Sequence, residues 1–242
     1  MNRNLLFSAW PYVATALFLT GMAVRYLLDR KHTTVVKEEM AEAWAVFRGS
    51  RVWRVSVMVL LLGHACALLF PQTLLAWDRR PERLYLLEAF ALTAALAAVA
   101  GAATLLWRHL GRTNRSAITE FSDTIFIALV LLGIVSGLLM AVVYRWASSW
   151  GALVLTPYIA SLLRASPASG LVTQMPFVVR LHIFSTFAAI AVLPLTRLAA
   201  FLVFAMNAGL ALAARPISAT GRATEAWLRR HNPASWLWPE ED

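Results

Sequence analysis

The sequence predicts an all-α membrane protein in which five transmembrane helices form a single membrane domain. Hydrophobic residues make up 60% of the 242 positions and charged residues only 14%, a composition typical of a chain whose outer surface is apolar. The charged residues crowd into short intervals between long uncharged runs, and about 20 apolar residues suffice for a helix to cross the roughly 30 Å hydrocarbon core. We predict five such helices, at about residues 9–28, 55–71, 86–107, 124–144 and 177–196.

Two shorter segments between these helices are predicted to lie along the membrane surface. Residues 29–54 mix lysine and glutamate with alanine and Trp44, which favours a short surface helix, either a docking surface or a solvated linker. Residues 150–164 are apolar but only about fifteen residues long, and they contain Pro157. They are too short to span the bilayer, so we expect a helix lying in the outer interface.

The fifth helix is predicted to extend beyond the membrane. The apolar sequence continues past Arg197 as far as Ala214, before a predicted cytoplasmic tail at residues 215–242. No hairpin is visible for a sixth span, so we expect one helix from 177 to about 214, whose length of about 57 Å exceeds the bilayer. Its projecting apolar end needs cover, which either a partner subunit or a bend into the membrane plane provides.

The distribution of basic residues predicts how the chain is oriented. The formal net charge is +9, from 22 Lys and Arg against 13 Asp and Glu. The basic residues sit at helix ends rather than along one face, which is typical of membrane orientation and not of nucleic-acid binding. Fifteen of the 22 lie in the alternate intervals that include 29–54 and the tail. The positive-inside rule therefore predicts an N-terminus outside and a cytoplasmic C-terminus.

Two of the five histidines lie inside predicted membrane helices. His64 is about seven residues before the outer end of the second helix, and His182 is about five residues after the outer start of the fifth. Because these helices run in opposite directions, both imidazoles reach a similar depth near the outer leaflet, where an ionisable side chain is costly and by default marks function. Two neutral imidazoles at matched depth can bind the iron of one haem from opposite sides, giving an electron carrier that binds no substrate at iron.

The neighbours of these histidines are small. The face of His182 and the helices beside it carry several small residues, namely Gly63, Ala67, Gly133, Ser136, Gly137, Ser185, Thr186 and Ala189. They leave room for a porphyrin, although glycines are also common wherever membrane helices pack closely. The alternative for the pair is two histidines hydrogen-bonded across a helix interface with no cofactor.

The remaining histidines and the cysteine carry less information. His32, His109 and His231 lie at loop, helix-end and tail positions and are interpreted as interfacial or solvated groups. Cys66 is the only cysteine, and no Cys-x-x-Cys-His motif is present, so a haem would be bound noncovalently.

Several motifs have the order and spacing of a known family over nearly the whole chain. They are Trp10-Pro11-Tyr12-Val13 with Arg25-Tyr26, Gly63-His64 followed by Pro71, and Phe177-Val178-Val179-Arg180-Leu181-His182 with Thr196-Arg197-Leu198. In these features the chain resembles the gamma subunit of respiratory nitrate reductases, a five-helix cytochrome b. The resemblance implies electron transfer from membrane quinol through two haems b to iron–sulfur and molybdenum subunits on the cytoplasmic side.

The resemblance also implies the haem ligands, and here the chain departs from the family. The outer haem of the family uses histidines at the positions of His64 and His182, and both are present. The inner haem uses a histidine ten residues before the first and another eighteen after the second, where this chain has Arg54 and Ala200. We therefore expect one haem b, with the inner one missing. An electron at the outer haem would then face much of the membrane thickness, so we hypothesise a redox partner on the periplasmic face.

The resemblance further implies a quinone site beside the outer haem. In the family a glycine just before the ligand and a lysine in the second outer loop hold the quinol. Gly63 matches the first, and Arg83 falls near the second with one residue deleted. Arginine can donate hydrogen bonds to a quinone oxygen but is a poorer proton relay than lysine. Alternatively, Arg83 only anchors a helix end among lipid headgroups.

Together these observations predict the membrane cytochrome b subunit of a respiratory oxidoreductase in a bacterial or archaeal inner membrane. His64 and His182 would be the axial ligands of one haem b, and Gly63 and Arg83 would form the quinone site. The partner would be an iron–sulfur or cytochrome protein. The alternative is a membrane anchor subunit without its own electron-transfer role. A transporter is disfavoured, because no acidic residue lies in the middle of a predicted helix and no half of the chain is repeated.

Overall fold

The computed structural model describes residues 3–48, 51–110, 117–144 and 147–230, and this part of the chain contains helices and no β-strand. Five of its helices are long and apolar enough to cross a membrane, which confirms the predicted fold class. They are α1 (Arg3–Asp29), α3 (Arg51–Leu69), α5 (Pro81–Leu110), α6 (Ala117–Val143) and α10 (Phe177–Val192). The first four begin several residues before the predicted runs, because polar and charged residues can continue a helix beyond the hydrocarbon.

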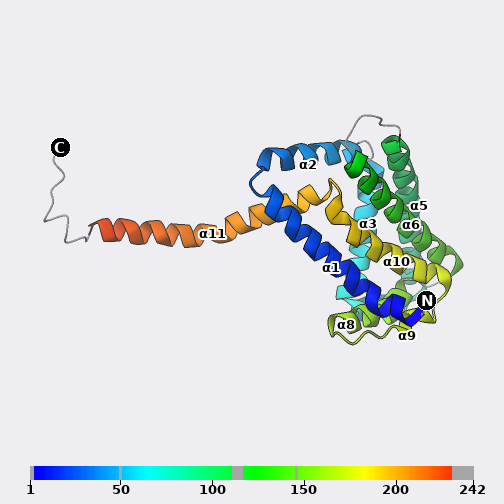
Figure 1. The fold of residues 1–242 in the computed structure, drawn as a ribbon. Helices are drawn as coiled ribbons and strands as arrows, with labels where there is room; N and C mark the ends of the chain where they lie inside the picture. The colour runs from blue at the N-terminus through cyan, green and yellow to red at the C-terminus, as the bar shows by residue number, and fades with distance from the viewer. Residues whose placement is uncertain (1–2, 49–50, 111–116, 145–146, 231–242) are drawn as a thin grey trace, which may run out of the picture.

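The five helices pack in an order that differs from their order in the chain. Helix α1 packs on α10, α10 on α6, α6 on α5, and α5 on α3 (Figure 1). The last spanning helix therefore lies between the first and the fourth. Large apolar side chains such as Leu61, Phe90 and Leu139 remain exposed on the outside of this bundle, as expected for a surface that contacts lipid.

One end of the bundle, here called the α8 end, is closed by short segments. These are α4 (Pro71–Asp78), α7 (Ala147–Trp150), the π-helical turn η1 (Gly151–Leu155), α8 (Thr156–Leu163) and α9 (Gly170–Thr173). The prediction of a short, non-spanning helix near 150–164 is confirmed. Two tyrosines fasten it to α1: the fully buried Tyr158 donates to the Phe7 carbonyl (2.6 Å), and Tyr12 donates to the Leu162 carbonyl (2.9 Å).

The opposite end, here called the α2 end, carries α2 (Thr33–Arg48) and the start of α11 (Ala199–Arg230). The helix predicted within 29–54 is thus confirmed as an element. A buried cluster joins α1, α2 and α11, and its members are Met22, Val36, Ala199, Ala200 and Val203. The α2 end is therefore packed with side chains.

The expectation of one continuous helix from 177 to about 214 is wrong. Helix α10 tightens into a 3-10 turn, η2 (Leu193–Leu195), and Thr196 is extended, with φ −99° and ψ 161°, before α11 begins. Pro194 explains the break, since proline lacks the amide hydrogen that a continuing helix needs and clashes with the preceding turn. Gly21 of α1 permits the close approach, because a Cβ there would lie 2.7 Å from the Pro194 Cβ.

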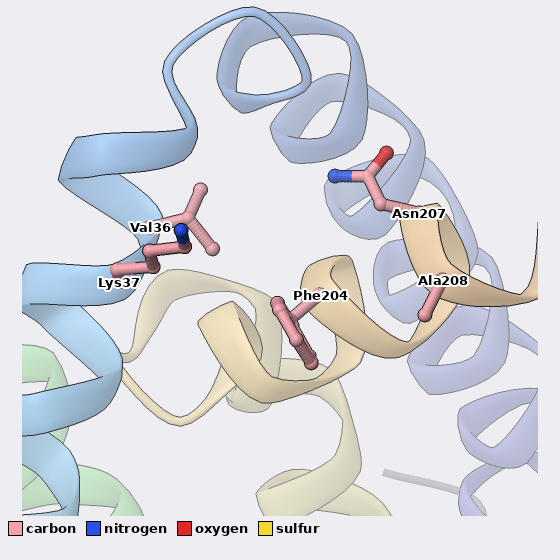
Figure 2. Close-up of a pocket in the computed structure, with 5 residues that line it drawn as sticks. All are labelled: Val36, Lys37, Phe204, Asn207 and Ala208. Carbon is pink, nitrogen blue, oxygen red and sulfur yellow. The ribbon is translucent and has the colours of Figure 1, made fainter. Parts of the chain in front are cut away.

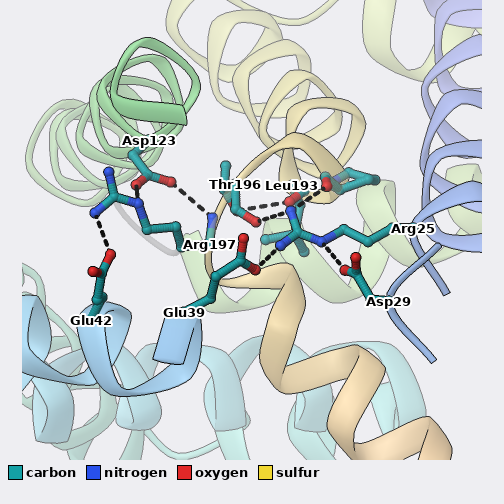
Figure 3. A network of polar contacts seen from close by, with 9 residues as sticks. Arg25, Asp29, Glu39, Glu42, Asp123, Leu193, Thr196 and Arg197 are labelled. Atoms are coloured by element: carbon teal, nitrogen blue, oxygen red, sulfur yellow. Dashed lines mark hydrogen bonds and ion pairs between the residues drawn. The ribbon is translucent and has the colours of Figure 1, made fainter. Parts of the chain in front are cut away.

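Two arginines hold the break in place (Figure 3). Arg25 of α1 donates to the carbonyls of Pro194 (3.3 Å) and Thr196 (2.9 Å), and the Thr196 carbonyl also accepts from the Ala199 amide (3.2 Å). It also pairs with Asp29 at 3.0 Å and with Glu39 of α2. Arg197 in turn binds carboxylates on two other helices, Asp123 of α6 and Glu42 of α2, each at 3.2 Å. The network therefore ties α1, α2 and α6 to the point where the chain turns.

We expect Arg25→Ala to destabilise the protein by roughly 2–4 kcal/mol. The substitution leaves the Pro194 and Thr196 carbonyls without their side-chain donor and removes the cation that neutralises Glu39. The measurement is the thermal unfolding midpoint of the detergent-solubilised chain. Arg30→Ala is the matched control, because Arg30 is exposed one turn further along the chain.

The effect of Arg25→Ala should also depend on pH. Burial raises the pKa of the Glu39 carboxyl above its ordinary value and Asp29 adds to the rise, while Arg25 and Arg197 oppose it. A carboxyl whose folded pKa is raised favours folding below its unfolded pKa, and this contribution is lost as the pH rises through the folded value. Without Arg25 the loss is greater, so the variant's deficit should be larger near neutral pH than near pH 4. An equal deficit at both would contradict this account.

Candidate functional site

His182 is held against α6 through one nitrogen of its ring. Its Nδ1–H donates to the Gly133 carbonyl at 2.8 Å, and the Ser136 hydroxyl lies 3.2 Å from the same nitrogen. A Cβ on Gly137 would lie 3.1 Å from Cε1 and 3.3 Å from Nδ1 of the ring, so a glycine is needed for the imidazole to lie this close to α6. These contacts fix the tautomer, leaving Nε2 unprotonated.

His64 has the same arrangement on α3, in a more open setting. Its Nδ1–H donates to the Leu60 carbonyl, one turn earlier, at 2.7 Å, and the side chain is exposed. Nothing outside the local chain lies within 4 Å of the place where a Gly63 Cβ would be. The Nε2 of His64 is therefore also a free acceptor, beside open space on the surface of the bundle.

The fold brings the two imidazoles together although α3 and α10 do not pack along their length. The ring centres are 6.0 Å apart and the planes are inclined by 23°. Both Nε2 atoms are acceptors, and two acceptors cannot hydrogen-bond to each other. The two rings are therefore stacked without a hydrogen bond between their Nε2 atoms.

The separation of the rings fits a metal ion held between them. An imidazole nitrogen binds a transition metal at about 2 Å, and two such bonds with roughly 1 Å from each ring centre to its nitrogen amount to about 6 Å. The centre-to-centre distance therefore equals this sum, and the two rings are stacked. Two neutral imidazoles whose other nitrogens donate to carbonyls are also the donor set that such a centre uses.

The small residues near His182 serve two different purposes. Ser185 and Ala189 are buried, and Ser185 lies toward α6, 3.5 Å from the place of a Gly133 Cβ. Only Thr186 of the three on α10 is exposed. Gly133, Ser136 and Gly137 accordingly position the His182 ring. The sequence had suggested instead that they line a space for a flat ligand. Of the small residues named from the sequence, Thr186 and Gly63 are the exposed ones.

The other histidines lie elsewhere. His32 is exposed in the turn between α1 and α2, and His109 is the penultimate residue of α5. His231 lies outside the described residues.

The chain is similar in sequence to known proteins over most of its length. Residues 3–217 match the family described as nitrate reductase gamma subunit. The chain belongs to this family. Gamma subunits are membrane subunits of respiratory nitrate reductases and are generally haem-binding b-type cytochromes. The resemblance predicted from the sequence motifs is thereby confirmed.

Two relatives illustrate how far this gamma-family chain has diverged. The nitrate reductase gamma chain of Bacillus subtilis (strain 168) is 24% identical over 203 residues, which cover 82% of this chain and 90% of that one. The nitrate reductase-like protein NarX of Mycobacterium tuberculosis (strain H37Rv) is also 24% identical, over 98% of this chain. This chain spans only 36% of NarX, which is therefore a much longer protein.

Ala200 and Arg54, at the two positions expected for the ligands of an inner haem, make other contacts. Ala200 is fully buried in the cluster that joins α1, α2 and α11. The Arg54 guanidinium lies over the Trp44 ring at 5.0 Å, which ties α3 to α2. Both residues therefore contribute to packing at the α2 end, where a gamma subunit with two haems would need ligands.

The two residues expected to hold quinone are not in contact. Arg83, in the first turn of α5, is exposed and lies with its guanidinium 5.0 Å above the Trp77 ring of α4. Gly63 has open space beside it, and no atom of Arg83 lies within 4 Å of a Cβ built there. A cation stacked on an interfacial tryptophan is also what a helix anchor among headgroups would look like.

We expect Gly137→Ala to lower the thermal unfolding midpoint even though alanine is the better helix former. The new methyl group would press on a ring that cannot yield, since the Gly133 carbonyl and Ser136 hold it from α6. Gly133→Ala is the matched control, because its Cβ would meet only the Ser185 hydroxyl at an ordinary 3.5 Å. The control should be neutral or slightly stabilising, and equal midpoints for the two variants would contradict this assignment.

Proposed function

We propose that this gamma-family chain is the membrane cytochrome b subunit of a respiratory oxidoreductase, with one haem b held between His64 and His182. It would pass electrons between quinol or quinone and a partner redox subunit. The observation that carries the proposal is the paired imidazoles, 6.0 Å apart, each with its Nδ1–H committed to a carbonyl. Family membership supports the haem as the ligand for that pair.

The residues of this chain would have three tasks at such a site. His64 and His182 would hold the haem iron through Nε2, and the group they hold would supply one-electron transfer without binding a substrate. The Gly133 carbonyl and Gly137 keep the His182 ring in a fixed orientation. Thr186 and Gly63, which carry little bulk on the open side, leave the space that a macrocycle needs.

We further propose that electrons enter and leave at the α8 end, on the outer side of the membrane. Basic residues are concentrated in the segments of the α2 end, which the positive-inside rule assigns to the cytoplasm. Ala200 and Arg54 stand at the two positions where the family has its inner-haem ligands, and both are engaged in packing, so an electron on its way to a cytoplasmic cluster would lack that intermediate haem. The distance from the proposed haem to an iron–sulfur or cytochrome partner is shorter at the outer face than at the cytoplasmic face.

The direct test is the visible spectrum of the purified chain and its histidine variants. The wild type should show a Soret band that shifts on dithionite reduction, while His64→Ala and His182→Ala should each lose the spectrum of a haem with two axial histidines. His32→Ala should match the wild type, because His32 is exposed at the other end of α1. Retention of the wild-type spectrum by either of the first two variants would contradict the ligand assignment. A folded wild type that takes up no haem would instead identify a membrane anchor without an electron-transfer role.

The proposed quinone site predicts a selective kinetic defect. Arg83→Ala should raise the KM for a soluble quinol analogue about tenfold, as expected for the loss of a hydrogen bond from a charged donor, with the haem spectrum unchanged. Arg80→Ala is the control, because Arg80 is exposed in the same connection between α4 and α5. Equal KM values for the two variants would leave Arg83 as a lipid anchor over Trp77.

A further inference from the structure

Helix α11 leaves the bundle soon after it begins. Its first turn is held at the α2 end, where Ala199, Ala200 and Val203 are fully buried. Beyond this turn the helix runs away from the other helices (Figure 1), and large apolar side chains along it, including Leu210 and Trp227, are more than half exposed. Such a helix would be unstable in water unless something covers its apolar side.

The projecting part of α11 is largely apolar as far as Ala214 and carries arginines beyond it. Leu202, Met206, Leu210 and Ala213 follow one another at intervals of four, four and three residues, all exposed, which is the spacing of one side of a helix. Trp227 falls on the same side four turns further on. The sequence places Arg215, Arg222 and Arg229 at intervals of seven, on the opposite side. The helix therefore carries an apolar side over residues 202–213, which Thr220 and Thr224 interrupt before Trp227, and a line of arginines that begins at Arg215.

Helix α2 does not cover the apolar face. It meets α11 across a groove lined by Val36 and Lys37 of α2 and by Phe204, Asn207 and Ala208 of α11 (Figure 2). Phe204 and Asn207 lie on the same side of α11 as the arginine line. The groove partly covers Phe204, whereas Leu212 on a neighbouring side and Met206 and Leu210 on the apolar side are exposed and do not line it.

Helix α11 begins directly after the last candidate membrane span. The candidate span that includes α10 ends at Leu195, and the Arg25 and Arg197 network fixes the turn immediately after it. An apolar face that begins at this level is at the height of the lipid headgroups. A helix with large apolar residues on one face and arginines on the other is the form that lies in a membrane interface.

We propose that α11 beyond residue 205 lies in the headgroup layer of the leaflet at the α2 end, with its apolar face toward the acyl chains and Arg215, Arg222 and Arg229 among anionic headgroups. The charge of the arginine line favours lipid over a protein partner, because it complements a phosphate surface over residues 215–229. The sequence left two ways to cover the projecting apolar end, a partner subunit or a bend into the membrane plane. The proposal selects the bend. The proposal does not depend on haem binding.

The test uses the full chain in a Cys66→Ser background, reconstituted in vesicles of phosphatidylcholine with about 30% phosphatidylglycerol. Nitroxide labels are attached at Leu210→Cys and Ala213→Cys on the apolar face, and at Ala211→Cys and Ser218→Cys on the opposite face. Power saturation should show the first pair accessible to oxygen and shielded from an aqueous nickel chelate, with the reverse for the second pair. Nickel access at all four sites would overturn the proposal. Shielding of the first pair that appears only when a partner redox subunit is added would assign the face to protein instead.

A charge series tests the role of the arginines. Replacing Arg215, Arg222 and Arg229 by glutamine should lower the ratio of docked to detached helix by about fivefold for each charge, the equivalent of about 1 kcal/mol near an anionic surface. The matched triple lysine variant should retain most of the docking. Both the wild type and the lysine variant should dock less in pure phosphatidylcholine. An unchanged ratio in the glutamine variant would remove the headgroups from the proposal.

Discussion

The hydrogen bond from His182 to the Gly133 carbonyl is the contact on which the site depends. A ring nitrogen left unpaired inside an apolar bundle costs roughly 2–7 kcal/mol, so the imidazole must find an acceptor among the helices. The acceptor is a backbone carbonyl of α6, 2.8 Å away, and Gly137 allows the ring to reach it. The close packing of α10 on α6 therefore also sets which nitrogen of His182 is left over, opposite His64 on α3.

The two ends of the bundle differ in how tightly their side chains are packed. At the α8 end the paired imidazoles adjoin open space beside Gly63. At the α2 end Ala200 is sealed into a core, and Arg25 and Arg197 bind α1, α2 and α6 around the break after Pro194. A flat cofactor can be accommodated only where side chains leave room. This asymmetry is consistent with the proposed single haem site near one face, because the α2 end is filled by packing.

Much of the fold and the histidine pair could be predicted from the sequence, because long uncharged runs and an ionisable residue within them are strong signals. The break after α10 was missed although Pro194 marks it, because the apolar pattern continues on both sides of the proline. The break is stabilised by Arg25, which is far away in the sequence. The positioning role of Gly133 and Gly137 was also misjudged. Glycines in adjacent turns indicate a close approach but do not say what approaches, and only the packing of α10 on α6 identifies the His182 ring.

The haem b content of the purified wild-type chain tests the central claim most directly. Pyridine haemochrome measured against protein by amino-acid analysis should give one haem b per chain, since one pair of imidazoles faces each other and the positions of a second pair hold Arg54 and Ala200. A ratio of two would contradict the assignment of those positions to packing. A ratio of zero in folded protein supplied with haem would contradict the proposed electron carrier altogether.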